Sequence, residues 1–84
     1  MTLVFDPVAL DGLQHWVQTD RKMALRGLKL IDEVLKNPFR GTGKPEPLKF
    51  SVSGCWSRRI DRTHRLVYKV EGDAVIILAC RYHY

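Results

Sequence analysis

Hydrophobic residues near the start of the chain recur at the spacing of a helix. A short β-prone run, TLVF, comes first and predicts a strand over residues 2–5. Asp6-Pro7 then has the pattern of a helix N-cap followed by proline at the first helical position. The apolar positions that follow share one helical face: Leu10, Leu13, Trp16 and Val17. This pattern predicts an amphipathic helix over residues 7–18.

A second amphipathic helix is predicted directly after the first. Thr19-Asp20 has the pattern of a break and a new N-cap. Apolar residues then repeat at four- and three-residue steps: Ala24, Leu28, Ile31 and Leu35. The helix ends near Asn37-Pro38, because proline disfavours the helical conformation in the residue before it. We expect the two helices to form a hairpin that covers a sheet.

The pattern becomes strand-like in the second half of the chain. Residues 37–50 hold two glycines and three prolines, which predicts an irregular loop. Three β-prone runs follow, at residues 55–60, 63–70 and 74–82. The expected fold is one α+β domain over residues 1–84, with a two-helix hairpin on one face of a mostly antiparallel sheet. The order of elements is β-α-α-β-β-β, and the last strand is apolar enough to lie centrally.

The length of the last hairpin loop decides which strand residues share a face, because side chains alternate along a strand. A three-residue loop at 71–73 places Val70 opposite Ala74. The helix-covered core face then holds Leu66, Tyr68, Val70, Ala74, Ile76, Leu78 and Cys80. The opposite, open face holds Arg65, Val67, Lys69, Ile77, Ala79, Arg81 and His83. A two-residue loop would separate Arg65 from His83, so we favour the three-residue loop.

The preceding hairpin sets the neighbours of the basic strand residues. A three-residue loop at 61–63 places Arg59 beside Arg65. On the same register, Cys55 and Cys80 lie on opposite faces, so we expect no disulfide between them. Cys55 falls on the open face, where it is either reactive or a small filler.

Composition and charge narrow the class of function. The sequence has no apolar segment of membrane-spanning length and no signal-peptide pattern, which favours a cytoplasmic protein. Two cysteines without a CxxC or His/Cys cluster predict neither a metal nor a cofactor. The formal net charge is +5, of which residues 43–84 carry +4. This excess favours a nucleic-acid partner, although it is also compatible with simple solubility.

The residues of the expected open face are suited to cleaving RNA without a metal. Such cleavage needs a base for the 2′-hydroxyl, cations for the charge that develops on the phosphate, and an acid for the departing 5′-oxygen. Histidine, with an ordinary pKa of about 6.5, suits the acid, and His83 is the candidate. The chain-terminal carboxylate of Tyr84 would favour its protonated form. We therefore expect the end of the chain to lie in a site.

Glu46 is the candidate base. It lies between Pro45 and Pro47, which stiffen the backbone on both sides. Lys44 and Lys49 flank it and would attract phosphate. The same residues are also compatible with a rigid surface loop that carries an exposed glutamate.

Two further pairs of residues have a structural as well as a functional interpretation. Arg58 and Arg59 could bind phosphate or line an ordinary solvated strand. Tyr82 and Tyr84 could stack on bases or pack within the protein.

Four stretches of the chain match the pattern of a known family. They are GTGKPEPLKF at 41–50, SGCWSRRI at 53–60, HRLVYKV at 64–70 and ACRYHY at 79–84. The chain resembles the YoeB toxins of bacterial toxin–antitoxin pairs, in the wider RelE superfamily. The helices match in pattern and placement more than in residue identity, and Cys55 stands where a larger apolar residue is expected.

The resemblance implies a ribosome-dependent, metal-independent endoribonuclease that cuts mRNA in the ribosomal A site and inhibits translation. Attack by the 2′-hydroxyl would leave a 2′,3′-cyclic phosphate. On this pattern Glu46 is the general base, His83 is the general acid, and Arg65 stabilises the phosphate in the transition state. The residues expected to bind RNA or support the site are Lys49, Arg59, Tyr84, Lys44 and Arg81.

The resemblance also implies partners. They are a YefM-like antitoxin, the 70S ribosome with its mRNA, and a second copy of the chain, with DNA contacted only through the antitoxin complex. Two alternatives remain: a ParE-like toxin that binds DNA gyrase, and a non-catalytic RNA-binding module. Glu46 and the terminal His83-Tyr84 disfavour the ParE-like alternative.

Overall fold

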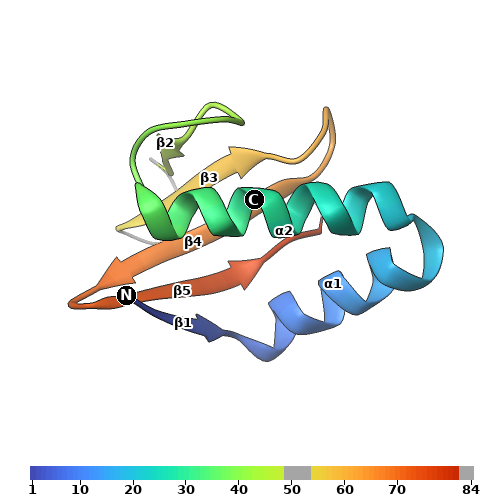
Figure 1. The fold of residues 1–84 in the computed structure, drawn as a ribbon, viewed down its shortest axis with the longest axis horizontal. Coiled ribbons are helices and arrows are strands. Elements are labelled where there is room, and N and C mark those ends of the chain that lie inside the picture. The colour runs from blue at the N-terminus through green and yellow to red at the C-terminus, as the bar shows by residue number, and fades with distance from the viewer. Residues whose placement is uncertain (49–53, 82–84) are drawn as a thin grey trace.

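Two helices lie on one face of a five-stranded sheet in the computed structural model, which describes residues 1–48 and 54–81 (Figure 1). The helices are α1 (Pro7–Thr19) and α2 (Arg21–Lys36). The strands are β1 (Thr2–Phe5), β2 (Glu46–Pro47), β3 (Cys55–Arg59), β4 (Arg65–Glu71) and β5 (Ala74–Ala79). Their order in the sheet is β1-β5-β4-β3-β2. Strand β1 runs parallel to β5, and each other pair of neighbours is antiparallel, which confirms the predicted fold class.

The helix ends follow from the predicted capping residues. The Asp6 carboxylate accepts a hydrogen bond from the backbone N–H of Val8 at 2.9 Å and caps α1. Asp20 caps α2 in the same way, through the N–H of Met23. Helix α2 ends at Lys36, with Asn37 as its C-cap. Both predicted helices are therefore confirmed to within a residue or two. Within the described ranges, neither helix is long and apolar enough to span a membrane.

The predicted buried faces of the helices are partly wrong. Helix α2 buries Met23, Ala24, Gly27, Leu30, Ile31 and Val34. Leu28, which we assigned to the buried stripe, is 46% exposed, and Leu10 and Val17 of α1 are exposed as well. Leucine and valine occur on both sides of each helix, so spacing alone does not choose between them. The buried sides contain alanine and glycine, which carry little hydrophobic signal, and at Gly12 a Cβ would lie 3.1 Å from Cys80 Sγ, so this glycine lets α1 approach the sheet closely.

The hairpin between β4 and β5 has a two-residue loop, so the predicted three-residue loop is wrong. Glu71 lies opposite Ala74, and Gly72 has φ +56°, the left-handed conformation that tight two-residue hairpin turns require. As a result Val75 and Ile77 face the helices, in place of the expected Ile76 and Leu78.

A β-bulge then restores the predicted faces farther along β5. Tyr68 lies opposite Ile77, whereas Val67 lies opposite Ala79, so Leu78 is an extra residue. Beyond the bulge, Cys80 is buried among the core residues and Ala79 lies on the other face. The shortened turn and the extra residue compensate each other.

The two cysteines lie in separate apolar clusters, as predicted. Cys80 belongs to the core between the helices and the sheet. Cys55 is buried on the opposite face with Val67 and Ala79, and Leu48 and Leu78 pack against this smaller cluster. Both cysteines are free thiols. The burial of Cys55, at 2% exposed, favours the filler interpretation.

The environment of Cys80 predicts low thiol reactivity. Burial raises the pKa of Cys80 to about 11, so only about a thousandth of it is thiolate at pH 8. We expect a coloured disulfide reagent to label neither cysteine in the native protein within minutes and to label both in denaturant. Rapid labelling of the native protein would contradict this burial.

Candidate functional site

A carboxylate, a hydroxyl and a guanidinium from three strands meet at one edge of the sheet. Arg65 of β4 donates from Nη1 to Glu46 Oε1 of β2 at 2.9 Å. The same Nη1 lies 3.2 Å from Ser57 Oγ of β3. The Glu46 side chain is 54% exposed, whereas that of Arg65 is 23% exposed. The carboxylate is therefore accessible to a substrate, and the guanidinium is held from the protein side.

The backbone around Glu46 forms a short edge strand that the sequence did not predict. Glu46 lies opposite Ser57, and Pro47 lies opposite Trp56. The N–H of Leu48 donates to the carbonyl of Cys55 at 2.9 Å. Proline cannot donate to a sheet ladder, so it is tolerated at such an edge. The backbone of Glu46 is therefore extended, and pairing with β3 adds to the stiffness expected from the flanking prolines.

Arg59 lies directly opposite Arg65, as predicted from the loop length. Like charges at facing positions of two strands repel each other and favour an anion between or beside them. Arg59 is exposed, and its backbone N–H donates to the carbonyl of Gly43 at 2.6 Å. The two arginines therefore form a cationic border next to Glu46.

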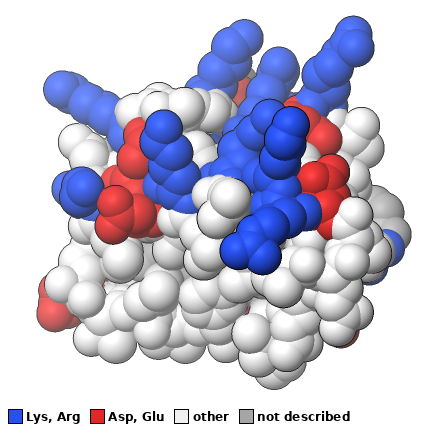
Figure 2. Space-filling model, turned by 45° about the vertical axis from the view of Figure 1, so that its right-hand side comes forward, with Lys and Arg blue, Asp and Glu red and all other residues white. Residues whose placement is uncertain are grey.

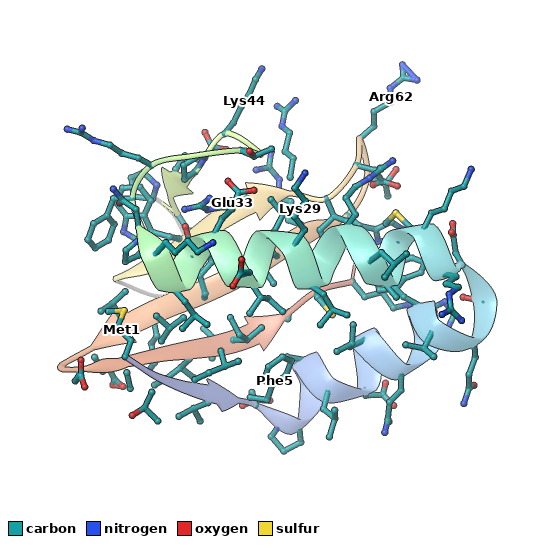
Figure 3. All side chains as sticks on the ribbon, in the orientation of Figure 1. Met1, Phe5, Lys29, Glu33, Lys44 and Arg62 are labelled. Atoms are coloured by element: carbon teal, nitrogen blue, oxygen red, sulfur yellow. The ribbon has the colours of Figure 1, made fainter. Side chains whose placement is uncertain are left out.

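The other predicted site residues are less closely gathered. Lys44 is exposed, has φ +53°, and projects away from the sheet edge (Figure 3). Arg81 is half-buried beside α1, where it lines a small cavity of about 110 Å³ with Gly12 and Cys80. The remaining three, Lys49, His83 and Tyr84, lie outside the described residues, and their roles stay predictions.

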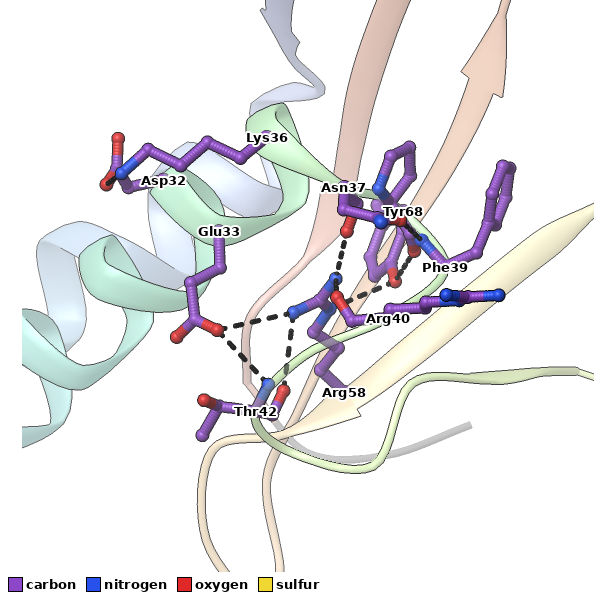
Figure 4. Close-up of polar contacts among 10 residues, drawn as sticks. Asp32, Glu33, Lys36, Asn37, Phe39, Arg40, Thr42, Arg58 and Tyr68 are labelled. Atoms are coloured by element: carbon purple, nitrogen blue, oxygen red, sulfur yellow. Dashed lines mark hydrogen bonds and ion pairs between the residues drawn. The ribbon is translucent and has the colours of Figure 1, made fainter.

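Both interpretations of Arg58 as a surface residue are wrong. Its side chain is fully buried. Nη2 donates to the carbonyls of Asn37 and Arg40 at 2.5 and 2.8 Å, and Nη1 donates to that of Thr42 at 3.4 Å (Figure 4). Nε donates to Tyr68 Oη at 3.2 Å. Strand alternation, which places Arg58 on the same side as Trp56, was the signal that could have found it.

Sequence reasoning also missed Glu33 as part of this arrangement. Glu33 Oε1 lies 3.8 Å from Arg58 Nη1 and accepts a hydrogen bond from the N–H of Thr42 at 3.1 Å. The hydrogen bonds from Thr42, first its backbone and then its side chain, lower the pKa of Glu33, and the charges of Arg58 and Lys29 lower it further. The carboxylate thus links α2 to the loop that leads into β2.

Positive charge is unevenly distributed over the surface. Figure 2 shows Lys and Arg side chains gathered over the upper side of the molecule, whereas the lower side is mostly uncharged. The upper side carries α2 and the edge formed by β2 and β3 (Figure 1). The exposed cations of this side include Lys29, Lys44 and Arg62 (Figure 3), and the exposed Arg59 belongs to β3. The cations of α2 therefore lie on the same side of the molecule as those of the β2–β3 edge.

The sequence and the fold match those of a known group of proteins. The family model described as "YoeB-like toxin of bacterial type II toxin-antitoxin system" matches residues 5–84. The chain belongs to the YoeB toxin family. It is thus the toxin of a toxin–antitoxin system, and the resemblance read from its motifs is confirmed.

Relatives and solved structures match this chain over its full length. Toxin YoeB of Streptomyces coelicolor is 49% identical over 84 residues, which is 100% of both chains. The YoeB/ParE toxin from Agrobacterium tumefaciens has a TM-score of 0.95 at 42% identity, with 100% of both chains covered. A YoeB dimer and a YoeB–YefM complex from Staphylococcus aureus have TM-scores of 0.91 and 0.88 at 38% and 36% identity, covering 100% of this chain and 98% of theirs.

The lowered pKa of Glu33 predicts a pH-dependent stability. A carboxylate whose pKa is lower in the folded protein stabilises the fold above its ordinary value of 4.5, and this contribution is lost as the pH falls through the folded-state pKa. We expect the wild type to exceed Glu33→Gln in free energy of unfolding at neutral pH and the difference to shrink as the pH falls below 4.5. Denaturant titrations at several pH values measure this.

The matched control for this prediction is Asp32→Asn. Asp32 pairs with Lys36 on the exposed side of the same helix, so its loss should change the free energy of unfolding by less than about 1 kcal/mol. A difference between wild type and Glu33→Gln that stays constant with pH would contradict the predicted role of the Glu33 carboxylate.

Proposed function

We propose that the chain is a metal-independent endoribonuclease that cuts mRNA in the ribosomal A site and thereby inhibits translation. The contact between Glu46 and Arg65, with Arg59 directly across from Arg65, is the observation that carries this proposal. It places an accessible carboxylate next to two cations, which is the chemistry that attack by a 2′-hydroxyl on phosphate requires.

Each residue has one role in the proposed reaction. Glu46 removes the proton of the 2′-hydroxyl, whose oxygen attacks the adjacent phosphorus. The bond from phosphorus to the 5′-oxygen breaks, and His83 donates a proton to that oxygen. The products are a 2′,3′-cyclic phosphate on one fragment and a 5′-hydroxyl on the other. Both proton transfers are accounted for without a metal ion.

The arginines stabilise the charge that grows on the phosphate oxygens in the transition state. Arg65 is held by Ser57 as well as by Glu46, so its position is set before substrate binds. Arg59, exposed across from it, is available to the phosphate or to the next nucleotide. Lys49, Tyr84, Lys44 and Arg81 are proposed to support RNA binding.

The wider surface is consistent with an RNA-rich partner such as the ribosome. The exposed cations of α2 and of the β2–β3 edge lie on the upper side of the molecule, where β2, the strand of Glu46, also lies (Figures 1 and 2). Clustered lysine and arginine side chains bind phosphate backbones without sequence preference. We propose a cytoplasmic location, because the ribosome and its message are there.

The chain is further proposed to pair with a YefM-like antitoxin and to form a homodimer. The relatives from Staphylococcus aureus that were solved as a YoeB dimer and as a YoeB–YefM complex support both partners. Exposed apolar side chains on the helices, among them Leu10, Val17 and Leu25, offer surface for such contacts. Any contact with DNA would be made through the antitoxin complex.

The first test replaces the proposed base. Glu46→Gln should lower the rate of cleavage of a translated message on 70S ribosomes by about 10²- to 10⁴-fold, because the amide cannot accept the proton. Mapping of 5′ ends and analysis of the termini should find 5′-hydroxyl and cyclic or 3′-phosphate ends. Glu71→Gln, which removes an exposed carboxylate at the end of β4, is the matched control and should cleave as the wild type does. Ribosome binding without any cleavage by the wild type would favour a non-catalytic RNA-binding module.

The second test concerns the proposed acid. His83→Gln should lose most of the cleavage at neutral pH while still binding the ribosome, because the amide cannot donate a proton to the leaving oxygen. A variant that cuts at the wild-type rate would remove His83 from the mechanism, and the role of Glu46 would then need another proton donor.

A further inference from the structure

We propose that Arg58 is a positioning residue for Glu46: its buried guanidinium holds the segment that leads into β2 and so fixes the proposed base against Arg65. The inference rests on the proposed function for its catalytic part and on the contacts of Arg58 for its structural part. Arg58 is fully buried, so it acts through its neighbours and not on RNA.

Hydrogen bonds from Arg58 hold the segment before β2 in place of regular backbone pairing. The segment between α2 and β2, residues 37–45, has no regular secondary structure. Three of its carbonyls, those of Asn37, Arg40 and Thr42, accept hydrogen bonds from the single guanidinium (Figure 4). A guanidinium has five N–H donors in a rigid plane, which suits it to collect several acceptors at once.

Two other side chains contact both the guanidinium and the segment and hold them together. Tyr68 Oη accepts from Arg58 Nε and itself donates to the carbonyl of Pro38 at 2.6 Å. Glu33 faces Arg58 and accepts from the N–H of Thr42. The segment is therefore held from β4 and α2 as well as from β3.

The segment fits closely around Arg58. Gly41 has φ +127°, and a Cβ at that position would lie 2.8 Å from Arg58 Nη1 and 3.0 Å from Glu33 Oε1. Both distances are shorter than ordinary contacts, so a side chain at residue 41 would displace the guanidinium or the carboxylate.

A backbone hydrogen bond of β3 connects this arrangement to the proposed base, Glu46. The next residue of β3, Arg59, donates its N–H to the carbonyl of Gly43, three residues before Glu46. Strand β2 has only two residues, so its own pairing with β3 offers few hydrogen bonds to define its position. The path of residues 37–43, which Arg58 sets, therefore determines where Glu46 begins its pairing with Ser57.

The test is a double-mutant cycle between Arg58 and Glu46. Lysine keeps the charge but has one ammonium group that cannot span the acceptors that Arg58 binds. We expect Arg58→Lys to lower the cleavage rate at saturating ribosomes by about 10- to 100-fold with little change in KM, because a small displacement of a catalytic group is costly. In the E46Q background, Arg58→Lys should lower the cleavage rate by less than about threefold, because the carboxylate that Arg58 positions is already absent.

Hydrogen exchange supplies a readout that does not depend on cleavage. The amides of Thr42 and Arg59, which donate to Glu33 and to Gly43, should exchange at least about tenfold faster in Arg58→Lys. The amide of Asp20, between the two helices, should exchange at the wild-type rate. Glu71→Gln, an exposed conservative substitution at the end of β4, is the control and should leave the exchange rates at Thr42 and Arg59 and the cleavage rate unchanged.

The outcomes separate this inference from the proposed function. Unchanged exchange at Thr42 and Arg59, or an equal loss of rate with and without the Glu46 carboxylate, would overturn the positioning role. If the wild type does not cut RNA, the proposed function fails, and the exchange rates alone decide whether Arg58 holds the segment. Should Arg58→Lys fail to fold, Tyr68→Phe, which removes the hydroxyl shared by Arg58 and Pro38, takes its place and should accelerate exchange at Thr42.

Discussion

A buried guanidinium organises the part of this protein that its regular secondary structure does not. Arg58 is fully buried, and the carbonyls of the segment after α2 accept hydrogen bonds from its N–H groups, which would be costly to leave unpaired. The charge itself is costly to bury, and Glu33 lies close enough to offset part of that cost. One polar contact thus joins the helix layer, the sheet and the irregular segment between α2 and β2. The edge at which Glu46 meets Arg65 depends on all three.

Much of the fold could be predicted because its signals are local. Aspartates at both helix starts and proline after Asn37 set the helix ends, and the three-residue loop at 61–63 placed Arg59 beside Arg65. Apolar spacing could not predict which side of each helix is buried, because the large residues Leu10 and Leu28 are exposed while small residues are buried. A helix that buries glycine and alanine against a sheet packs closely on it. A count of large apolar residues does not reveal this packing.

Individual residues of the candidate site could be predicted from the sequence, but the contacts that hold them in place could not. Glu46 stood out because of its flanking prolines, yet a strand of two residues has no periodicity from which to infer it. Arg58 was grouped with Arg59 because the two are adjacent in sequence, although adjacent strand residues point to opposite faces. The contacts that hold Arg58 come from residues up to 25 positions before it in the chain, and only the folded structure brings them together.

The bulge at Leu78 links the length of a turn to the orientation of the strand that follows it. The two-residue turn at Gly72-Asp73 by itself would exchange the faces of every later residue, and the one extra residue reverses that exchange. A family member with one more residue in the turn could therefore keep the same faces without a bulge. Insertions in the turn and losses of the bulge should accordingly occur together during divergence of the family, whereas either change alone would move Cys80 out of the helix-covered core and turn Ala79 toward the helices.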